Sequence, residues 1–284
     1  MKKIDTHQHL FYPEQFGYGW TADFPALQGS FSVDAYLEVA AGCEIVQSLF
    51  MEVDVDVGQH LGEARFFMDL AEKPGSGIGG VIAKCLPEAE NFPNELEALR
   101  SPALKGVRRV LHTQDDALSQ SARFRANVAT LAEADLTFDL CVTQRQLPLA
   151  RDLVRACPEV SFILDHCGVP SIADHVSTDS ESWRQWQSGI RDLAAEPNVS
   201  CKFSGITAYA GPEQRTVDGM RPYLHELLEA FGSGRIVWGS DWPVCNLAEG
   251  LNAWSTITDA LLAELSPQEQ HSICIENARR VYKL

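Results

Sequence analysis

The sequence lacks the features that define several large classes of protein. No window of its 284 residues approaches the roughly 18 consecutive apolar residues that a membrane-spanning helix needs. The formal net charge is −16, and lysine and arginine do not cluster. Binding to nucleic acid or to an anionic membrane requires clustered basic side chains, so neither partner is expected. The acidity is typical of a solvated surface.

The eight cysteines include no Cys-x-x-Cys pair. Several stand in apolar, strand-like runs, where a free thiol behaves as a small buried hydrophobe. This pattern favours a reducing compartment over a disulfide framework. Residues Met1 to Asp5 pass directly into an apparent strand and lack the apolar stretch of a signal peptide. We therefore expect a cytoplasmic protein.

Short apolar runs alternate with longer helical patterns along the whole chain. The runs are rich in Val, Ile, Leu and Phe and are apolar on both faces, which is typical of parallel strands covered by helices. The predicted strands are residues 3–9, 45–52, 79–85, 104–112, 136–142, 160–166, 199–205 and 235–241. The predicted helices are residues 32–41, 57–72, 91–100, 120–134, 145–157, 181–195, 216–231 and 250–264, with a last one beginning at Ser266-Pro267-Gln268-Glu269, a capping-box pattern.

This alternation continues without a linker rich in Gly, Pro or Ser. It predicts the α/β class and a single (β/α)8 TIM barrel, with one domain over residues 1–284. A doubly wound open sheet is the alternative. The missing Gly-x-Gly-x-x-Gly after the first predicted strand disfavours that alternative.

Polar side chains follow three of the predicted strands at their carboxyl ends. His7 and His9 stand two apart on the first, so they should project to the same side. His166 ends the apolar run Phe162 to Leu164, and Asp241 stands where the last strand stops. Taken alone, each has a structural explanation, such as a side chain that caps a turn. Together they predict an active site, because the active site of a barrel lies at these strand ends.

The same residues carry a resemblance to a known family. His7-Gln8-His9, Asp165-His166, Gly239-Ser240-Asp241-Trp242-Pro243 and the ending Glu276 to Tyr282 resemble the amidohydrolase superfamily. More narrowly, they resemble its amidohydrolase-2 branch, which contains sugar lactonases and a pyrone-dicarboxylate lactonase. Gly106 to Arg109 and Lys202 to Gly205 fit the same branch. The resemblance covers the whole chain and implies a barrel hydrolase.

The sequence departs from the two-metal members of that superfamily. Many of them use a carbamylated lysine on the fourth strand and a histidine on the fifth, whereas this chain has Arg108 and Arg109 on the fourth and no histidine in 136–142. A two-metal site is therefore not expected. His7, His9, His166 and Asp241 could hold one divalent ion such as Zn²⁺. The lactonase group that the sequence resembles also includes enzymes that work without metal. A site with one metal ion and a site without metal therefore both stay open.

Further residues are candidates for binding a small-molecule substrate. They are Arg108, whose guanidinium fork matches carboxylate and hydroxyl groups, Lys202, Glu52, and Trp20 in the long aromatic loop over residues 10–31. His112 and His175 are left without a role.

The leading hypothesis is hydrolysis of a small lactone, sugar-derived or acidic, in which Asp241 activates water and the three histidines polarise the carbonyl directly or through a metal. A metal-dependent decarboxylase of the same branch is the alternative. The remote alternative is a barrel that binds a ligand without catalysing a reaction. The sequence leaves the oligomeric state open.

Overall fold

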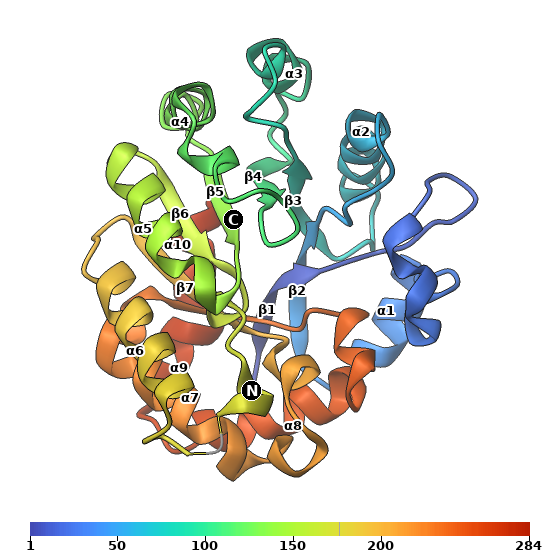
Figure 1. The fold of residues 1–284 in the computed structure, drawn as a ribbon. Helices are drawn as coiled ribbons and strands as arrows, with labels where there is room; N and C mark the ends of the chain where they lie inside the picture. Colours follow the sequence, from blue (N-terminus) through green and yellow to red (C-terminus); the bar gives the residue numbers. More distant parts are fainter. Residues whose placement is uncertain (176) are drawn as a thin grey trace.

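The protein folds as a closed ring of parallel strands surrounded by helices, in a computed structural model that describes residues 1–175 and 177–284 (Figure 1). Eight strands form one sheet in the order of the sequence. They are β1 (Lys3–Gln8), β2 (Ile45–Met51), β3 (Ile78–Lys84), β4 (Leu104–Val110), β5 (Thr137–Cys141), β6 (Ser161–Leu164), β7 (Val199–Ser204) and β8 (Ile236–Gly239). The predicted (β/α)8 barrel is confirmed.

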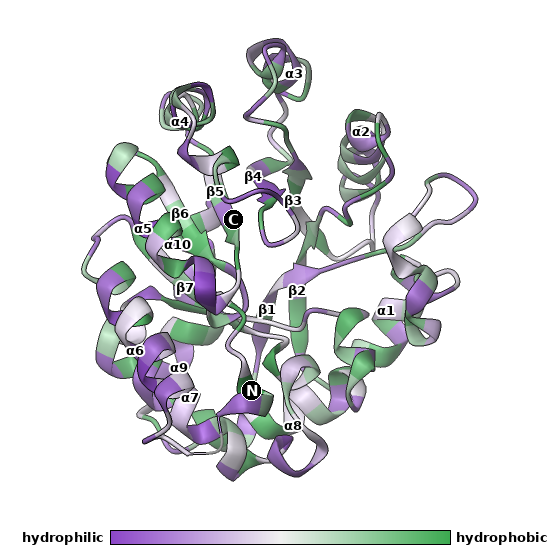
Figure 2. Cartoon of the chain, in the orientation of Figure 1, coloured by the Kyte–Doolittle hydropathy of each residue, from purple (hydrophilic) through white to green (hydrophobic). Residues whose placement is uncertain are grey.

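Helices follow each strand and form the outer ring. They are α1 (Val33–Ala40), α2 (His60–Ala71), α3 (Phe92–Ala98), α4 (Ala122–Ala129), α5 (Leu147–Ala156), α6 (Glu181–Ala194), α7 (Val217–Phe231), α8 (Gly250–Leu262), α9 (Pro267–His271) and α10 (Asn277–Tyr282). In Figure 2 many of these helices carry both purple and green segments, as expected when one face packs on the sheet and the other meets water. None of the described helices is long and apolar enough to cross a membrane.

Local sequence signals account for where several helices begin. The Ser32 hydroxyl accepts a hydrogen bond from the Ala35 amide and caps α1. Ser266 and Glu269 form the predicted capping box at the start of α9. Helix α4 is shorter than its predicted span of 120–134, because the chain leaves the α-helix after Ala129 and continues as turns.

The barrel closes where β8 meets β1. At this junction the Asp241 amide donates to the His7 carbonyl at 2.8 Å, and the His9 amide donates to the Trp242 carbonyl at 2.7 Å. Asp5 reinforces the junction: its Oδ1 accepts from the amides of His7 and Ser240. These bonds lie at the carboxyl ends of both strands, so the residues that follow β1 and β8 are held side by side.

Candidate active site

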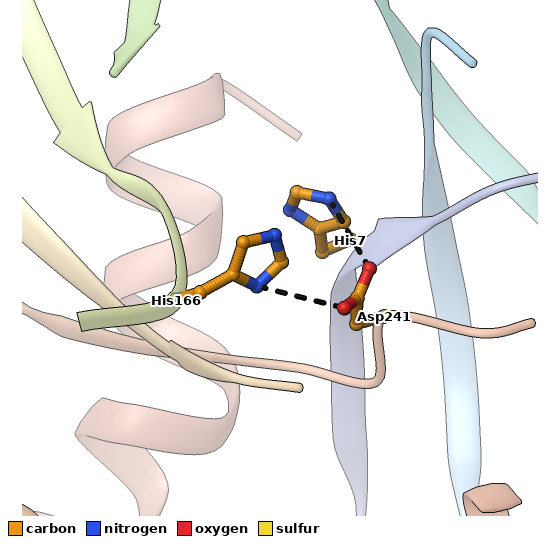
Figure 3. Close-up of side chains that lie close together, drawn as sticks. All are labelled: His7, His166 and Asp241. Carbon is orange, nitrogen blue, oxygen red and sulfur yellow. Dashed lines mark ion pairs between the residues drawn. The ribbon is translucent and has the colours of Figure 1, made fainter. Parts of the chain in front are cut away.

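The four residues predicted to form the active site converge at the carboxyl end of the barrel. Figure 3 shows His7, His166 and Asp241 with their side chains directed toward one another. The Asp241 carboxylate lies 3.4 Å from Nε2 of His9, 3.7 Å from Nε2 of His7 and 3.8 Å from Nδ1 of His166. All four residues are buried. The structure therefore brings together a carboxylate and three imidazoles from three separate strand ends.

Three of these residues, His9, His166 and Asp241, do not lie on strands, contrary to the predicted spans of 3–9, 160–166 and 235–241. Strand β1 ends at Gln8. Strand β6 ends at Leu164 and β8 ends at Gly239. His166 has a φ of 49° and Asp241 a φ of 60°, in the left-handed region that residues with a Cβ rarely adopt. Each such residue costs about 1–2 kcal/mol. The surrounding structure holds this strained backbone at the site, which is a pattern found at catalytic residues.

The close approach of the β7 and β8 ends depends on Gly205. Its own φ is 61°, and a Cβ at this position would lie 2.3 Å from Oδ2 of Asp241. A side chain there would collide with the carboxylate. Glycine is therefore required both for the backbone conformation and for the space that Asp241 occupies.

Burial keeps the imidazoles neutral. It lowers the pKa of His7 well below its ordinary value, an effect to which the neighbouring Lys202 adds. Burial also lowers the pKa of His166, and it lowers the pKa of His9 to about 3, with Arg108 adding to the shift. At neutral pH the site therefore presents uncharged imidazoles.

The tautomer of His9 follows from its partner. Nδ1 of His9 lies 2.9 Å from the Met51 carbonyl, which can only accept a hydrogen bond. Nδ1 must carry the proton, so Nε2 of this neutral ring has a free lone pair. His9 can therefore accept a hydrogen bond from water or hold a metal ion. Of the two predicted ways to polarise the carbonyl, this tautomer of His9 leaves only the one through a metal, because Nε2 has no proton to donate.

Asp241 is the carboxylate best placed to react. Its side chain is 2% exposed, and its Oδ2 has no hydrogen-bond partner among the described residues. Burial raises the pKa of Asp241 to about 6. The neighbouring Asp165 behaves in the opposite way: although burial opposes it, the Lys202 ammonium and His7 hold the pKa of Asp165 well below its usual range. The two carboxyl groups are therefore tuned to different tasks.

Arg108 and Glu52 form a buried ion pair beside the histidines. Nε of Arg108 donates to Oε1 of Glu52 at 2.6 Å, and Nη2 donates to the Glu52 carbonyl at 2.8 Å. Nη1 of Arg108 lies 3.3 Å from Nε2 of His7 and 3.5 Å from Oδ2 of Asp165. Arg108 thus borders the site, whereas Glu52 is completely buried behind it. Both oxygens of Glu52 in these contacts accept from Arg108, so Glu52 holds the guanidinium in place.

Lys202 lies inside the barrel below the histidines. It is completely buried, and its Nζ lies 2.8 Å from Asp139, 2.9 Å from Asp165 and 3.1 Å from Nδ1 of His7. These groups surround the ammonium. The two carboxylates hold the ammonium in place beside His7.

The remaining predicted residues lie farther from the four-residue cluster. Trp20 is 37% exposed and donates through Nε1 to the Val53 carbonyl, next to Glu52. Other aromatics of the 10–31 loop form a small core: Phe11 stacks on Tyr18 with ring centres 4.9 Å apart. His112 is exposed, and its Nδ1 lies 3.3 Å from Sγ of Cys141.

His175 lies between helices rather than at the site. It is buried, and its two ring nitrogens contact the Tyr223 hydroxyl and the Gln144 amide oxygen. These contacts indicate a structural role.

Sequence reasoning missed the residues that support the cluster from within the barrel. Asp139 and Asp165 both contact Lys202, and Tyr282 donates its hydroxyl proton to Asp139 at 2.8 Å. A signal was present for Asp139, which interrupts the apolar run of β5 as a charged residue. For Tyr282 no spacing rule connects the end of the chain with the fifth strand.

The donor set fits one divalent metal ion. Ligand atoms of His7, His166 and Asp241 all lie within 4.8 Å of one another, and imidazole and carboxylate are ligands that Zn²⁺ prefers. The unpartnered Oδ2 of Asp241 is a free acceptor in this group. His9, also predicted as a ligand, lies beside the group through its contact with Asp241. The Arg108 guanidinium beside His7 disfavours a second cation.

An eight-stranded barrel with histidines and an aspartate at the ends of β1, β6 and β8 has the arrangement typical of the active site of a barrel enzyme. The family model described as amidohydrolase, Amidohydro_2, matches residues 4–284. The chain belongs to this family, as its resemblance implied.

Three relatives illustrate the similarity. The L-fucono-1,5-lactonase of Burkholderia ambifaria is 32% identical over 87% of this chain and 82% of the relative. The L-fucono-1,5-lactonase of Burkholderia multivorans is 28% identical over 99% of this chain and 96% of the relative. A crystal structure of a Burkholderia multivorans amidohydrolase with bound zinc superposes with a TM-score of 0.89, at 27% identity and with complete coverage of both chains.

Proposed function

We propose that the protein hydrolyses a sugar-derived lactone, with Asp241 as the general base. The observation that carries the proposal is the Asp241 carboxylate itself. It is buried, its Oδ2 accepts no hydrogen bond from residues 1–175 and 177–284, and it is held within 3.4–3.8 Å of nitrogens from three neutral imidazoles. The relatives named as lactonases support this reaction class.

Hydrolysis of the cyclic ester requires a base, a donor to the carbonyl and an acid for the leaving oxygen. Asp241 takes a proton from water, and the resulting hydroxide adds to the carbonyl carbon. Oxyanion charge develops on the carbonyl oxygen, where N–H groups of His7 and Arg108 can donate to it. The ring C–O bond then breaks, and protonated Asp241 returns its proton to the departing alkoxide. The product is an open-chain hydroxy acid.

When a metal ion is bound, His7, His166 and Asp241 would hold it, and it would supply Lewis acidity and lower the pKa of a bound water. His9 offers its Nε2 lone pair beside this group. The roles proposed above, with Asp241 as the base and His7 as a donor to the carbonyl oxygen, involve only groups of the protein itself.

The charge balance near the site favours a neutral lactone ring over a carboxylated one. Arg108 pairs with Glu52 and Asp165, and Lys202 pairs with Asp139 and Asp165. Recognition of a substrate carboxylate uses a cation with free donors. These two buried cations already have carboxylate partners, whereas the hydroxyl groups of a sugar lactone need only polar hydrogen-bonding groups.

The proposal is tested by proton release from a lactone panel. Purified protein is assayed with a pH indicator on neutral aldonolactones and on 2-pyrone-4,6-dicarboxylate, with and without chelator. We expect turnover of at least one aldonolactone and little or none of the dicarboxylate. Absence of turnover on every lactone, together with release of CO₂ from an aromatic acid, would favour the decarboxylase alternative and overturn the proposal.

A further inference from the structure

We propose that Asp54 and Lys84 form a subsite beside the catalytic residues that binds the ring hydroxyls of a neutral aldonolactone. The inference rests on the proposed function and deepens it, because it names groups that would recognise the sugar. It assigns a role to a charged pair at the mouth of the barrel that the hydrolysis described above does not use.

Asp54 belongs to a short segment at the end of β2 that binds several residues of the site. Its contacts, in chain order, join the Met51 carbonyl to Nδ1 of His9 at 2.9 Å, Oε1 of Glu52 to Nε of Arg108 at 2.6 Å, the Val53 carbonyl to Nε1 of Trp20 at 2.8 Å, and the Asp54 amide to Oε2 of Glu52 at 2.6 Å. Glu52 therefore links the backbone of Asp54 to the Arg108 guanidinium. Because Arg108 borders His7, Asp54 is held at the edge of the site.

Lys84 enters the same region from β3. It stands in register with Arg108 of β4, and paired residues of neighbouring strands point to the same face of the sheet. Arg108 points into the barrel, where its Nη1 lies 3.3 Å from Nε2 of His7. Lys84 therefore also points inward, one strand spacing of about 4.8 Å away from Arg108. Its Nζ lies 2.6 Å from Oδ1 of Asp54 and donates to the Val55 carbonyl at 2.8 Å.

The backbone of Asp54 is strained in the same way as that of two residues in the cluster. Its φ is 51°, compared with 49° for His166 and 60° for Asp241. All three residues follow the carboxyl ends of their strands. Strained residues of this kind gather at active sites and at the groups that clamp ligands. The fold thus maintains at Asp54 a conformation that costs stability, as it does at the two reactive strand ends.

The pair offers a ligand both an acceptor and a donor. The Asp54 side chain is 32% exposed and that of Lys84 11%, so a small molecule can reach both. The ion pair uses Oδ1 of Asp54, which leaves Oδ2 to accept from a ligand. Two of the three ammonium hydrogens are directed at Asp54 and Val55, and the third can be donated.

This combination suits hydroxyl groups better than a substrate carboxylate. A hydroxyl group both donates and accepts, so one ring hydroxyl can donate to Asp54 while its neighbour accepts from Lys84. A substrate carboxylate would instead be repelled by the Asp54 carboxylate. The subsite therefore agrees with the preference for a neutral lactone that follows from the paired charges of Arg108 and Lys202.

Trp20 extends the subsite with an apolar surface. Its Nε1 donates to the carbonyl of Val53, the residue before Asp54, and the side chain is 37% exposed. The loop that carries it is held by the Gly19 amide, which donates to Oδ1 of Asp56 at 3.1 Å. An aromatic face beside polar groups matches a sugar ring, which has apolar C–H faces and a polar edge.

The test compares Asp54→Gly with the wild type on lactones with and without hydroxyl groups. Glycine adopts the left-handed conformation and keeps the amide that binds Glu52, so the variant removes only the carboxylate. With the aldonolactone that the wild type hydrolyses fastest, KM should increase about tenfold and kcat should change by less than about threefold, because an ionic hydrogen bond to a hydroxyl is lost. With δ-valerolactone, which has no hydroxyl groups, kcat/KM should change by less than about twofold.

Asp135→Gly is the matched control. Asp135 also has a left-handed backbone, with a φ of 58°, and also pairs with a lysine, Lys283, but it precedes β5 at the opposite end of the barrel. Its replacement should leave both kinetic constants unchanged. If Asp54→Gly does not fold, Asp54→Asn is measured in the same way, because asparagine also tolerates the left-handed conformation. In a folded series, Asp54→Asn keeps one acceptor oxygen and should restore part of the lost affinity.

A binding measurement separates this inference from the proposed function. Aldopyranoses carry ring hydroxyls but no ester, and L-fucose, L-rhamnose, D-galactose and D-glucose are titrated into each protein by calorimetry. We expect Asp54→Gly to bind at least one of them about tenfold more weakly than the wild type does. Equal losses of kcat/KM on both kinds of lactone, or an unchanged KM for the aldonolactone, would overturn the subsite.

The two proposals can fail separately. If the wild type hydrolyses no lactone, the proposed function fails, and calorimetry decides the subsite. Weaker sugar binding by Asp54→Gly would then support it. Equal binding by the variant, or no sugar binding by the wild type, would overturn it.

Discussion

Replacing Asp241 with Asn should remove activity and make the fold more stable at neutral pH. The folded-state pKa of Asp241 is about 6, compared with an ordinary value of 3.8. A raised carboxyl pKa means that folding favours the protonated form. The stabilising effect of that proton is complete below pH 3.8 and is lost as the pH rises through about 6. Above that pH the wild type carries a buried charge that the fold disfavours.

The size of this effect follows from the shift. The difference between about 6 and 3.8 is roughly 2 pKa units, or about 3 kcal/mol at 1.36 kcal/mol per unit. The cost of burying an asparagine amide without a hydrogen-bond partner would offset part of this gain in stability. We therefore expect a net stabilisation of about 1–3 kcal/mol at pH 7.5. For a chain of this length that corresponds to a rise in Tm of about 2–5 °C. General base catalysis contributes about 10²–10⁴-fold, so kcat should fall by at least about 100-fold.

The assay measures kcat and urea unfolding on the same preparations at pH 7.5 and pH 4.5, in the presence of chelator. The stabilisation should shrink at the lower pH, because the wild-type carboxyl group is protonated there. Asp165→Asn is the control: this carboxylate is also completely buried, but its pKa is shifted in the opposite direction, so its loss should destabilise the fold at pH 7.5. An Asp241→Asn protein that is less stable than the wild type yet keeps its turnover would refute the reasoning. It would show that Asp241 caps a turn.

Three further outcomes are expected. The kcat/KM of the chelator-treated enzyme should increase with pH through about 6 and then level off, because Asp241 acts as its carboxylate; a profile that falls over this range would contradict the assignment of the base. Elemental analysis of protein purified without added metal should give one equivalent of divalent ion or fewer, since Arg108 stands beside His7; two tightly bound equivalents would show that the ligand set is wrong. Gly205→Ala should lower kcat strongly, because the new methyl group would lie 2.3 Å from Oδ2 of Asp241. Gly234→Ala is the control and should retain activity, because the space around Gly234 is open.

The order of the strands could be predicted because each apolar run is long enough to be recognised and each is followed by a helical pattern. The exact strand ends could not. His166 and Asp241 follow their apolar runs within two residues, and the sequence does not show that the chain turns there through left-handed conformations. Hydrophobic periodicity reports which residues are buried, and both of these residues are buried whether they lie on the strand or just after it.

The cluster of His7, His9, His166 and Asp241 could be predicted because the barrel topology fixes where strand ends meet. The partners of Arg108 and Lys202 could not be predicted in the same way. Both were expected to reach the substrate, since a cation near a strand end has donors to offer. The structure pairs each with carboxylates that lie on other strands or just after them. Such pairing depends on register and side-chain direction across the barrel, which the sequence pattern of a single strand does not contain.

Burial has opposite consequences for the groups of this site, and that contrast connects the fold with the chemistry. The same exclusion of water raises the pKa of Asp241 and lowers the pKa of His7, His9 and His166. A carboxylate that holds its proton more tightly is a better base, and imidazoles that stay neutral keep defined donor and acceptor atoms. Although burial opposes it, Lys202 and His7 hold the pKa of Asp165 well below its usual range, so one buried carboxylate remains charged beside the cations. The barrel thus shifts the pKa values of two neighbouring carboxyl groups in opposite directions, although both side chains lie within reach of His7.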